Sequence, residues 1–389
     1  MPATRRRRAA LLPLPATDLD QLRERVRALA EKRPAVYQML DAGGNVLYVG
    51  KAKSVRTRLL SYFRASYPDD KAARILYATH DITWTYVPSE FAAFLTECSL
   101  IRQHRPHFNW HMNRTRRPVL ITVSAGRAPR IRAHVGLGQG DERAYGPFKS
   151  MDRTQEAVRV LNDLLGLRDC ALTMPIVFAG QGDLFGSERR AACPRHDFGL
   201  CAGPCAGFVS EDAYRDRIEA AVAFLEGRAI QPVDRVVQAM GEAAGAANFE
   251  LAARWRERFE QLEWLLAATS RARSAVDLLT FVYRDPGHLG DDRAYILRHG
   301  VVCGSYPWPA TPIEDAAFRA AIAEELERPA PPTAPLPAEH LDEILLMMFW
   351  FRTHPDALRR TTPLEQWTAL DTPETPETSL PETMTGTGT

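Results

Sequence analysis

Residues 35–52 read AVYQMLDAGGNVLYVGKA, and this stretch decides the fold of the front of the chain. Two short runs rich in β-branched and aromatic residues, 35–40 and 46–49, flank a segment that contains Gly and Asn. Such runs, separated by turn-forming residues, predict a β-hairpin. The hairpin carries Tyr37 on its first strand and Tyr48 on its second.

The residues that follow predict a helix, a third strand and a second helix. In the first helix the apolar residues share one side, whereas Arg58 and Tyr62, four residues apart, share another. Residues 82–87 alternate like a strand, and 89–103 predict a helix that ends before a proline. Glu97 lies in the middle of that helix among apolar residues. The hairpin, the third strand and the two helices together indicate a small α+β domain. Arg58 and Tyr62 give the first of these helices a polar side.

The rest of the chain alternates between strand and helix patterns. Gly, Pro and polar clusters mark the breaks between the elements. In order, we expect strands with Gly-rich turns at 118–148, a helix at 153–165, two long helices at 210–227 and 232–268, strands at 278–283, 294–297 and 301–303, a Pro-rich linker at 329–337 and a helix at 341–351.

Composition points to an ordinary protein of two or three domains with an uneven charge distribution. The 389 residues are 45% hydrophobic and 25% charged, with a net charge of +1. Through Pro118 there are 21 Lys plus Arg against 10 Asp plus Glu, a net of +11, so the remainder carries −10. The front third is therefore the candidate polyanion binder. No signal peptide or membrane span is evident, so we expect a cytoplasmic protein without a membrane partner.

The hairpin and the residues after it resemble the GIY-YIG endonucleases, and in particular the excinuclease family of UvrC and its short relative Cho. Residues 48–53, YVGKAK, closely match the second motif of that family, whereas Ala35 replaces the glycine of the first. Any one polar residue in this region is more often structural, but seven in the family order point to a nuclease. The resemblance implies these catalytic residues: Tyr37, Tyr48, Lys51, Arg58, Tyr62, Glu97 and Asn109.

Phosphodiester hydrolysis explains these residue types. The reaction needs a water in line with the leaving oxygen and neutralisation of charge on the phosphate. A lone carboxylate, Glu97, suits one Mg²⁺ or Mn²⁺ ion that keeps most of its waters. Arg58 can fork onto the phosphate, and Lys51 can act as a point charge near Tyr48 that favours its phenolate.

Tyr48 is the candidate general base, but its ordinary acidity is too weak for that role. A free tyrosine has a pKa of ~10, so only about one in a thousand is ionised at pH 7. Either Lys51 and a metal-held water assist its ionisation, or Tyr48 only orients the water. The family resemblance favours the first alternative. Tyr37, Tyr62 and Asn109 are expected to position the others through hydrogen bonds.

Basic residues surround these motifs and could follow DNA phosphates. No helix resembles a reader of the major groove, so we expect recognition of the backbone and of distorted DNA shape. The candidate DNA-binding residues are Lys53, Arg56, Arg64, Arg102, Arg105, Arg114, Arg116 and Arg117.

Four of the six cysteines lie between positions 170 and 205 on a Gly- and Pro-rich segment. The segment resembles the cysteine region of the UvrC family, which implies a [4Fe-4S] cluster. Four thiolates also suit tetrahedral Zn²⁺, which stays the alternative. The candidate ligands are Cys170, Cys193, Cys201 and Cys205.

Residues 240–262 resemble the UVR motif, by which the UvrC family docks on UvrB, the protein that loads onto damaged DNA. Small Ala residues allow close approach of two helices, and aromatic residues anchor interfaces. Gly241 and Gly245 depart from good helix propensity by roughly 1 kcal/mol each. The alternative is a plain helix pair that buries Phe249 in its own core. The candidate partner-binding residues are Met240, Phe249, Glu250, Ala253 and Trp255.

We therefore predict an α+β protein with six segments. They are a basic N-terminal segment (1–32), a GIY-YIG nuclease domain with a three-stranded antiparallel sheet flanked by helices (33–115), a strand region with the cysteine-rich segment (118–209), a helical UVR-like module (210–270), a small C-terminal α/β region of unassigned role (275–367) and a disordered tail (371–389). The resemblance implies a metal-dependent endonuclease of nucleotide excision repair that nicks damaged double-stranded DNA on the 3′ side of a lesion. The alternatives are a silent adaptor that binds UvrB and a GIY-YIG nuclease outside repair.

Overall fold

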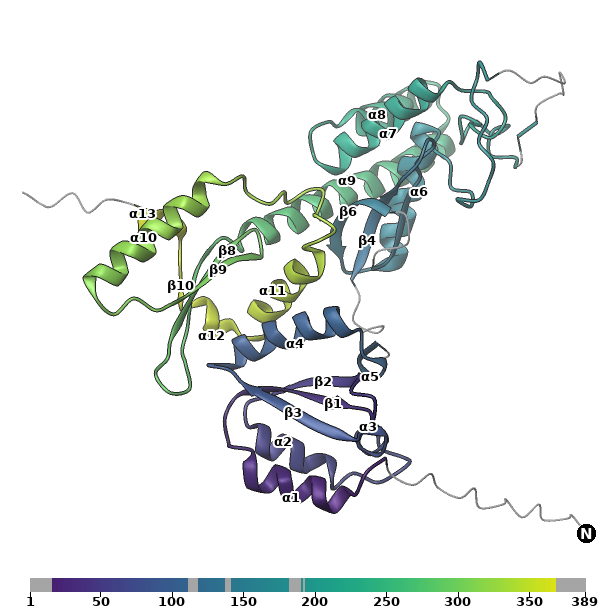
Figure 1. The fold of residues 1–389 in the computed structure, drawn as a ribbon. Helices are drawn as coiled ribbons and strands as arrows, with labels where there is room; N and C mark the ends of the chain where they lie inside the picture. The colour runs from purple at the N-terminus through teal and green to yellow at the C-terminus, as the bar shows by residue number, and fades with distance from the viewer. Residues whose placement is uncertain (1–15, 111–117, 137–140, 182–189, 192, 369–389) are drawn as a thin grey trace, which may run out of the picture.

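A computed structural model describes residues 16–110, 118–136, 141–181, 190–191 and 193–368. These residues form three antiparallel sheets that follow one another along the chain. Figure 1 shows the first sheet in purple and blue, the second in blue with teal helices beside it, and the third in green. Residues 1–15 of the predicted basic segment, the predicted tail at 371–389, and Arg114, Arg116 and Arg117 lie outside the described residues. No helix in the described ranges is long and apolar enough to span a membrane.

The first sheet has the strand order β2-β1-β3 and contains the predicted hairpin. Tyr37 pairs with Gly50 on one side and with Trp84 on the other. The turn is fixed by Asp41, whose Oδ1 accepts 2.8 Å hydrogen bonds from the backbone N–H groups of Gly43 and Asn45. The strands are β1 (Ala35–Leu40), β2 (Val46–Ala52) and β3 (Asp81–Tyr86).

Helices cover both faces of this sheet, as predicted for a GIY-YIG domain. One face packs its buried Tyr37, Met39 and Tyr48 against three helices, and the other face packs Val36 and Val49 against α4. Three of the helices, α1, α3 and the short α5, were not predicted. The helices are α1 (Leu19–Leu29), α2 (Val55–Tyr62), α3 (Lys71–Ala78), α4 (Glu90–His104) and the short α5 (His107–Trp110).

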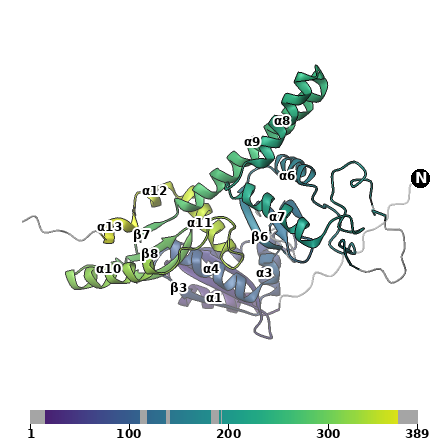
Figure 2. The same ribbon diagram turned by 90° about the horizontal axis from the view of Figure 1, so that it is seen from above.

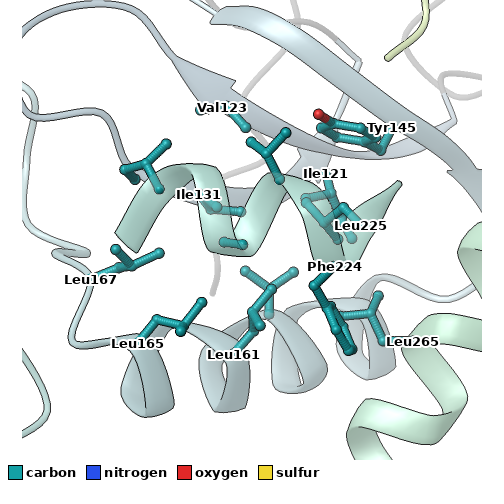
Figure 3. Close-up of a cluster of buried hydrophobic side chains, with 14 of the residues drawn as sticks. Ile121, Val123, Ile131, Tyr145, Leu161, Leu165, Leu167, Phe224, Leu225 and Leu265 are labelled. Atoms are coloured by element: carbon teal, nitrogen blue, oxygen red, sulfur yellow. The ribbon is translucent and has the colours of Figure 1, made fainter. Parts of the chain in front are cut away.

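The second sheet confirms the strands and the helix predicted between 118 and 165. Its order is β5-β4-β6, and its core is shared with four helices. Figure 3 shows Ile121 and Tyr145 of the sheet facing Leu161 of α6, with Phe224 of α7 and Leu265 of α9 beside them. The elements are β4 (Val119–Ser124), β5 (Ile131–Val135), β6 (Asp141–Phe148) and α6 (Met151–Leu165).

The helix predicted at 232–268 is divided in two at residues 246–248, near the expected break at Gly245 to Asn248, and its two parts form the helical hairpin. Its tip, α8 with the start of α9, projects from the rest of the molecule in Figure 2. The second helix continues to Asp277, beyond the predicted end at Ala268, because Ala272 and Val276 are still buried on it. The helices of this part are α7 (Glu211–Leu225), α8 (Gln231–Gly245) and α9 (Phe249–Asp277).

The C-terminal sheet contains the three predicted strands and a short fourth one, in the order β10-β7-β8-β9. One of its helices, α10, was not predicted, although Thr311 and Glu314 form a capping box at its start. The elements are β7 (Phe281–Asp285), β8 (Arg293–Arg298), β9 (Val301–Pro307), α10 (Pro312–Glu327), α11 (Leu341–Thr353), α12 (Pro355–Leu358), β10 (Thr361–Thr362) and α13 (Leu364–Thr368). Helix α4 lies between the first sheet and α11 (Figure 1).

Candidate active site

Three tyrosines meet on the first sheet and on α2. The hydroxyl groups of Tyr37 and Tyr62 are 2.9 Å apart, and the side chain of Tyr48 hydrogen-bonds to Tyr62. The three rings lie 6.0 to 6.4 Å apart between centroids. All three side chains are buried. Their hydroxyl groups therefore form a fixed network, and such preorganisation is what a positioning role requires.

Burial raises the pKa of each tyrosine above its ordinary value. For Tyr48 the cause is first its burial, then the neighbouring Tyr62 and the carboxylate of Glu97, while the Arg58 guanidinium opposes them. Burial also has the largest effect on the pKa of Tyr37 and of Tyr62. The protein alone therefore keeps the three phenols neutral at pH 7.

Gly50 is the residue that makes room for this network. A Cβ atom at this position would lie 2.5 Å from both Cζ and the hydroxyl oxygen of Tyr37, and 2.9 Å from Cε1 of Tyr48. These distances are shorter than any van der Waals contact between such atoms. The glycine of the second motif is thus required because the ring of Tyr37 lies against the backbone of β2. Ala35, in contrast, is fully buried in the core, where its methyl group is accommodated.

Arg58 extends the network toward solvent. Its Nε donates a 3.4 Å hydrogen bond to the hydroxyl of Tyr37, and its guanidinium carbon lies 5.3 Å from the centroid of the Tyr62 ring. The side chain is anchored on one side and the residue is exposed. The prediction that Arg58 and Tyr62 share one side of their helix is confirmed, and the remaining guanidinium donors can reach an anion.

Glu97 lies across β2 from the tyrosines, on α4. Burial raises its pKa from 4.5 to about 7, and the charges of Lys51 and Arg58 and a hydrogen bond from the backbone N–H of Lys51 oppose that shift. Glu97 in turn raises the pKa of Tyr48, so the two side chains are within electrostatic range. β2 is an edge strand, so groups from the two faces of the sheet are separated there by a single strand. Tyr48 and Glu97 are close enough for their charges to interact across it.

Lys51 does not occupy the predicted place beside Tyr48. Its Nζ lies 4.6 Å from the ring centroid of Phe94 on α4 and 5.7 Å from that of Trp350 on α11. Side chains three residues apart on a strand point to opposite faces, so Lys51 and Tyr48 cannot share a face. The cation that lowers the pKa of Tyr48 is Arg58. The prediction that Lys51 favours the Tyr48 phenolate is thus wrong.

Asn109 holds the outer edge of β2. Its Oδ1 accepts a hydrogen bond from the backbone N–H of Val49, and its Nδ2 donates one to the carbonyl of the same residue, both at 2.8 Å. The side chain is buried, and its amide pairs with the edge strand as a neighbouring strand would. Asn109 therefore positions the backbone next to Tyr48, as a hydrogen-bonding residue that does not itself face a substrate.

The candidate DNA-binding residues differ in their solvent exposure and in whether they form ion pairs within the protein. Lys53 forms a 2.7 Å ion pair with Glu90, although its side chain is 75% exposed. Arg105 ends α4 in the left-handed conformation with φ 44°. Arg64 and Arg102 are exposed, and Arg56 is half-buried. All five of these residues lie on the nuclease domain.

The four clustered cysteines are free thiols in loops next to the second sheet. Burial raises the pKa of Cys201, a backbone hydrogen bond from Gly203 lowers it, and Cys193 and Cys170 raise it further. Three of the four are therefore within electrostatic range of one another. Within the described ranges, however, no three Cys, His, Asp or Glu side chains are arranged to hold a metal ion. The cluster stays a prediction.

The predicted partner-binding residues lie at the tip of the α8–α9 hairpin. Phe249 is 73% exposed, which excludes the alternative that it is buried in its own helix pair. Glu250 pairs with Arg254 at 3.1 Å, and Ala253 is exposed. Trp255 and Met240 are partly buried, and the Trp255 ring lies 4.5 Å from the guanidinium of Arg258. Phe249 thus offers an aromatic side chain without an intramolecular role.

Comparison with known proteins matches two parts of the chain to families. Residues 33–110 match the UvrC-like GIY-YIG domain, and residues 119–224 match the middle domain of the UvrC/Cho excinucleases. These two parts of the chain are similar to the UvrC/Cho excinucleases. The matched ranges contain all seven candidate catalytic residues and the four clustered cysteines. The C-terminal sheet lies outside both ranges.

Curated relatives are UvrABC system proteins C of bacteria. The protein of Alkalilimnicola ehrlichii is 34% identical over 239 residues, which are 61% of this chain and 37% of that protein. The protein of Methylococcus capsulatus is 30% identical over 272 residues, 70% of this chain and 43% of that protein. The chain thus spans about two fifths of the length of these relatives.

Among solved structures, a similar one is the N-terminal GIY-YIG endonuclease domain of UvrC from Thermotoga maritima bound to its catalytic divalent cation, magnesium. It is 33% identical, covers 23% of this chain and 97% of that chain, and has a TM-score of 0.21. A point mutant of the same domain, also bound to its catalytic divalent cation, is 31% identical and covers 94% of that chain, again with a TM-score of 0.21.

Sequence reasoning missed two residues of this site. The first, Gly50, was part of the quoted motif, but its requirement becomes visible only when the ring of Tyr37 is placed against it. The second, Trp350, lies at the other end of the chain, and no local pattern could have paired it with Lys51.

Proposed function

We propose that the protein is a metal-dependent DNA endonuclease of nucleotide excision repair, which nicks damaged DNA on the 3′ side of a lesion. The observation that carries this proposal is the grouping of Arg58 and the three tyrosines in one hydrogen-bond network, with Glu97 within electrostatic range of Tyr48 and Arg58. An exposed guanidinium, a half-buried carboxylate and fixed hydroxyl groups are what hydrolysis of a phosphodiester needs in one place.

Each residue has a chemical task that follows from its setting. Arg58, anchored by Tyr37, directs its free donors at the non-bridging oxygens of the scissile phosphate. Tyr48, held by Tyr62, directs its hydroxyl at the attacking water and orients it in line with the leaving oxygen. Asn109 and Gly50 keep the backbone of β2 in the shape that this arrangement requires.

Glu97 fits the role of the protein ligand to one Mg²⁺ or Mn²⁺ ion. Its side chain is half-buried, and desolvation raises its pKa to about 7 although the neighbouring cations Lys51 and Arg58 oppose the shift. A desolvated carboxylate of this kind binds a hard divalent cation in place of a proton. When bound, such an ion supplies positive charge to the phosphate and to the leaving oxygen.

The remaining partners follow from the basic surface and from the hairpin. The exposed arginines around the nuclease domain suit the DNA backbone. The exposed Phe249 suits docking to UvrB on DNA, as an aromatic anchor does in protein interfaces. This reaction on chromosomal DNA would take place in the cytoplasm of a bacterium.

The cysteine segment is proposed as a [4Fe-4S] site with Zn²⁺ as the alternative, and it has no step in the reaction. Its support is the family resemblance and the electrostatic proximity of Cys170, Cys193 and Cys201. The arrangement of the described residues does not fit a formed metal centre. Elemental analysis of protein purified without oxygen tests this proposal: iron and sulfide, or zinc, support it, and a metal-free protein overturns it.

The proposed function is tested by incubating the protein with a lesion-bearing duplex, Mg²⁺ and the damage-loading proteins of excision repair. A single nick on the 3′ side of the lesion supports the proposal. Cutting of undamaged DNA at a specific sequence would instead indicate a GIY-YIG nuclease outside repair. Binding to UvrB without any cutting would indicate an adaptor, although an adaptor has no need for the complete set of Tyr48, Arg58 and Glu97.

A further inference from the structure

The nuclease domain and the C-terminal sheet share one hydrophobic core through α4. Phe91 and Phe94 of this helix are buried, and both point away from the first sheet. The ring of Phe91 lies 5.0 Å from that of Tyr283, 4.9 Å from that of Tyr295 and 5.1 Å from that of Trp350. Edge-to-face contacts at these distances stabilise aromatic clusters beyond their burial alone. The helix that carries Glu97 is thus packed from both sides.

Polar contacts fix the start of α4 to the same sheet. Ser89 caps the helix by accepting a 2.9 Å hydrogen bond from the backbone N–H of Ala92. The same hydroxyl donates to the carboxylate of Asp285, a buried residue at the end of β7. In addition, the backbone N–H of His288 donates a 2.7 Å hydrogen bond to the carbonyl of Pro88. The position of α4 along its axis therefore depends on the C-terminal sheet.

One side chain of α11 reaches the nuclease site itself. Trp350 is 4% exposed, and its ring centroid lies 5.1 Å from that of Phe94. Together these two rings flank the Nζ of Lys51, at 5.7 and 4.6 Å from their centroids. Both distances are within the range of cation–π attraction. Lysine side chains are flexible, so two rings restrict the ammonium more than one would.

We propose that the C-terminal unit, residues 279–364, completes the nuclease site, and that Trp350 is a positioning residue that holds the ammonium of Lys51 next to α4. The ring of Trp350, 5.7 Å from the cation, is itself stacked with His354, at 3.9 Å between centroids and an interplanar angle of 17°. This arrangement gives the C-terminal unit a role in the reaction. As a contribution to catalysis, the inference rests on the proposed function.

The placement of Lys51 is testable without any nuclease activity. We would label the full chain briefly with an amine-reactive ester and measure the modified fraction of Lys51 by peptide mass spectrometry. In Trp350→Leu, which keeps an apolar side chain but no π face, Lys51 should react roughly threefold faster or more. In Trp350→Phe, which keeps a ring, the rate should stay near that of the wild type.

Trp308→Ala is the matched control. Trp308 is a second tryptophan of the same unit, but it contacts Trp367 and Arg284 and belongs to a different core cluster from α4. Its replacement should leave Lys51 labelling unchanged. Equal labelling in the wild type and in Trp350→Leu would overturn the proposal. An equal increase in Trp308→Ala would also overturn it, because the effect would then come from general loosening of the unit.

Measurement of the incision rate then distinguishes a failure of this inference from a failure of the proposed function. If the wild type nicks DNA, Trp350→Leu should lower the single-turnover rate about tenfold with little change in DNA affinity, and Trp350→Phe should restore it. Faster labelling of Lys51 together with an unchanged incision rate would contradict the catalytic part of the inference. If the wild type does not nick DNA, the proposed function fails, and the labelling alone decides whether Trp350 holds Lys51.

Discussion

The nuclease domain and the C-terminal unit pack against opposite sides of α4, yet they differ in how they are encoded. In the nuclease domain, the site residues lie within about 75 residues and follow a recognisable order. The C-terminal unit has no motif, although its Phe281, Tyr283 and Trp350 form one core with Phe91 and Phe94. The candidate catalytic residues can therefore be identified from a short motif. The residues that pack against them and hold them in place come from distant parts of the chain.

The largest expected effect is on the incision rate, when Arg58 of the short motif region is replaced. Arg58→Ala removes the guanidinium that faces the phosphate and should lower the single-turnover incision rate on the order of 100- to 1000-fold. Arg56→Ala, two residues earlier on the same helix, is the matched control and should change the rate by only severalfold. Similar rates for the two variants would mean that Arg58 acts only as one more surface charge.

Two glycine-to-alanine substitutions compare how tightly the candidate site and the projecting hairpin are packed. Gly50→Ala would place a methyl group against Tyr37 and should lower the free energy of unfolding by about 1 to 3 kcal/mol. Gly241→Ala in α8 meets no atom within 4 Å and should raise it by up to about 1 kcal/mol. Denaturant unfolding of both variants measures the difference. A tolerated Gly50→Ala would show that the tyrosine network is not tightly packed.

The pH dependence of stability tests the burial of Glu97. Because its pKa is raised from 4.5 to about 7, the folded protein holds the proton more tightly than the unfolded chain. That contribution to stability is complete below pH 4.5 and is lost as the pH rises through about 7. Without divalent cations, Glu97→Gln should therefore be more stable than the wild type at pH 8, by up to about 3 kcal/mol, with little difference near pH 4.

Addition of Mg²⁺ at pH 8 further distinguishes the stability of the wild type from that of Glu97→Gln. Binding to the folded wild type should raise its melting temperature, and the variant should not respond. Thermal unfolding at several pH values, with and without Mg²⁺, measures both effects. A wild type that is more stable than Glu97→Gln at pH 8 without metal would show that the carboxylate is already compensated within the protein.

The smallest expected effect on stability is at the hairpin tip. Phe249 is 73% exposed, so Phe249→Ala should leave the melting temperature nearly unchanged. Binding to UvrB should weaken by about 1 to 2 kcal/mol, the range of an aromatic interface anchor. Calorimetric titration measures this loss, and Val237→Ala on the neighbouring helix is a suitable exposed control. Unchanged affinity would leave the hairpin with only a structural role.

The sequence predicted the elements that carry a clear period or a known motif. The first hairpin, the strands of the second and third sheets and the long helices were found because their apolar residues repeat at regular spacing. Helix α1 was missed because its buried Leu22 and Val26 are hidden among arginines in a segment that looked merely basic. Helix α10 was missed although Thr311 and Glu314 form a capping box.

The sequence identified the residues of the candidate site better than it predicted how their side chains are arranged. The family order predicts that Tyr48, Arg58 and Glu97 converge, and in the structure the charges of Arg58 and Glu97 both act on the pKa of Tyr48. The direction of Lys51 could have been read from strand alternation, since an odd separation from Tyr48 puts it on the opposite face. The contact between Lys51 and Trp350 could not, because only the tertiary fold brings β2 and α11 together.

The most direct test of one shared metal and phosphate site is the dependence of incision on Mg²⁺ concentration. We would measure single-turnover nicking of a lesion-bearing duplex, loaded by the repair proteins, for the wild type and for Glu97→Gln. The account predicts a 3′ nick whose rate saturates with a single Mg²⁺ ion, and no nick from the variant while its binding of DNA and UvrB is kept. Incision by Glu97→Gln at the wild-type rate, with the same Mg²⁺ dependence, would contradict it.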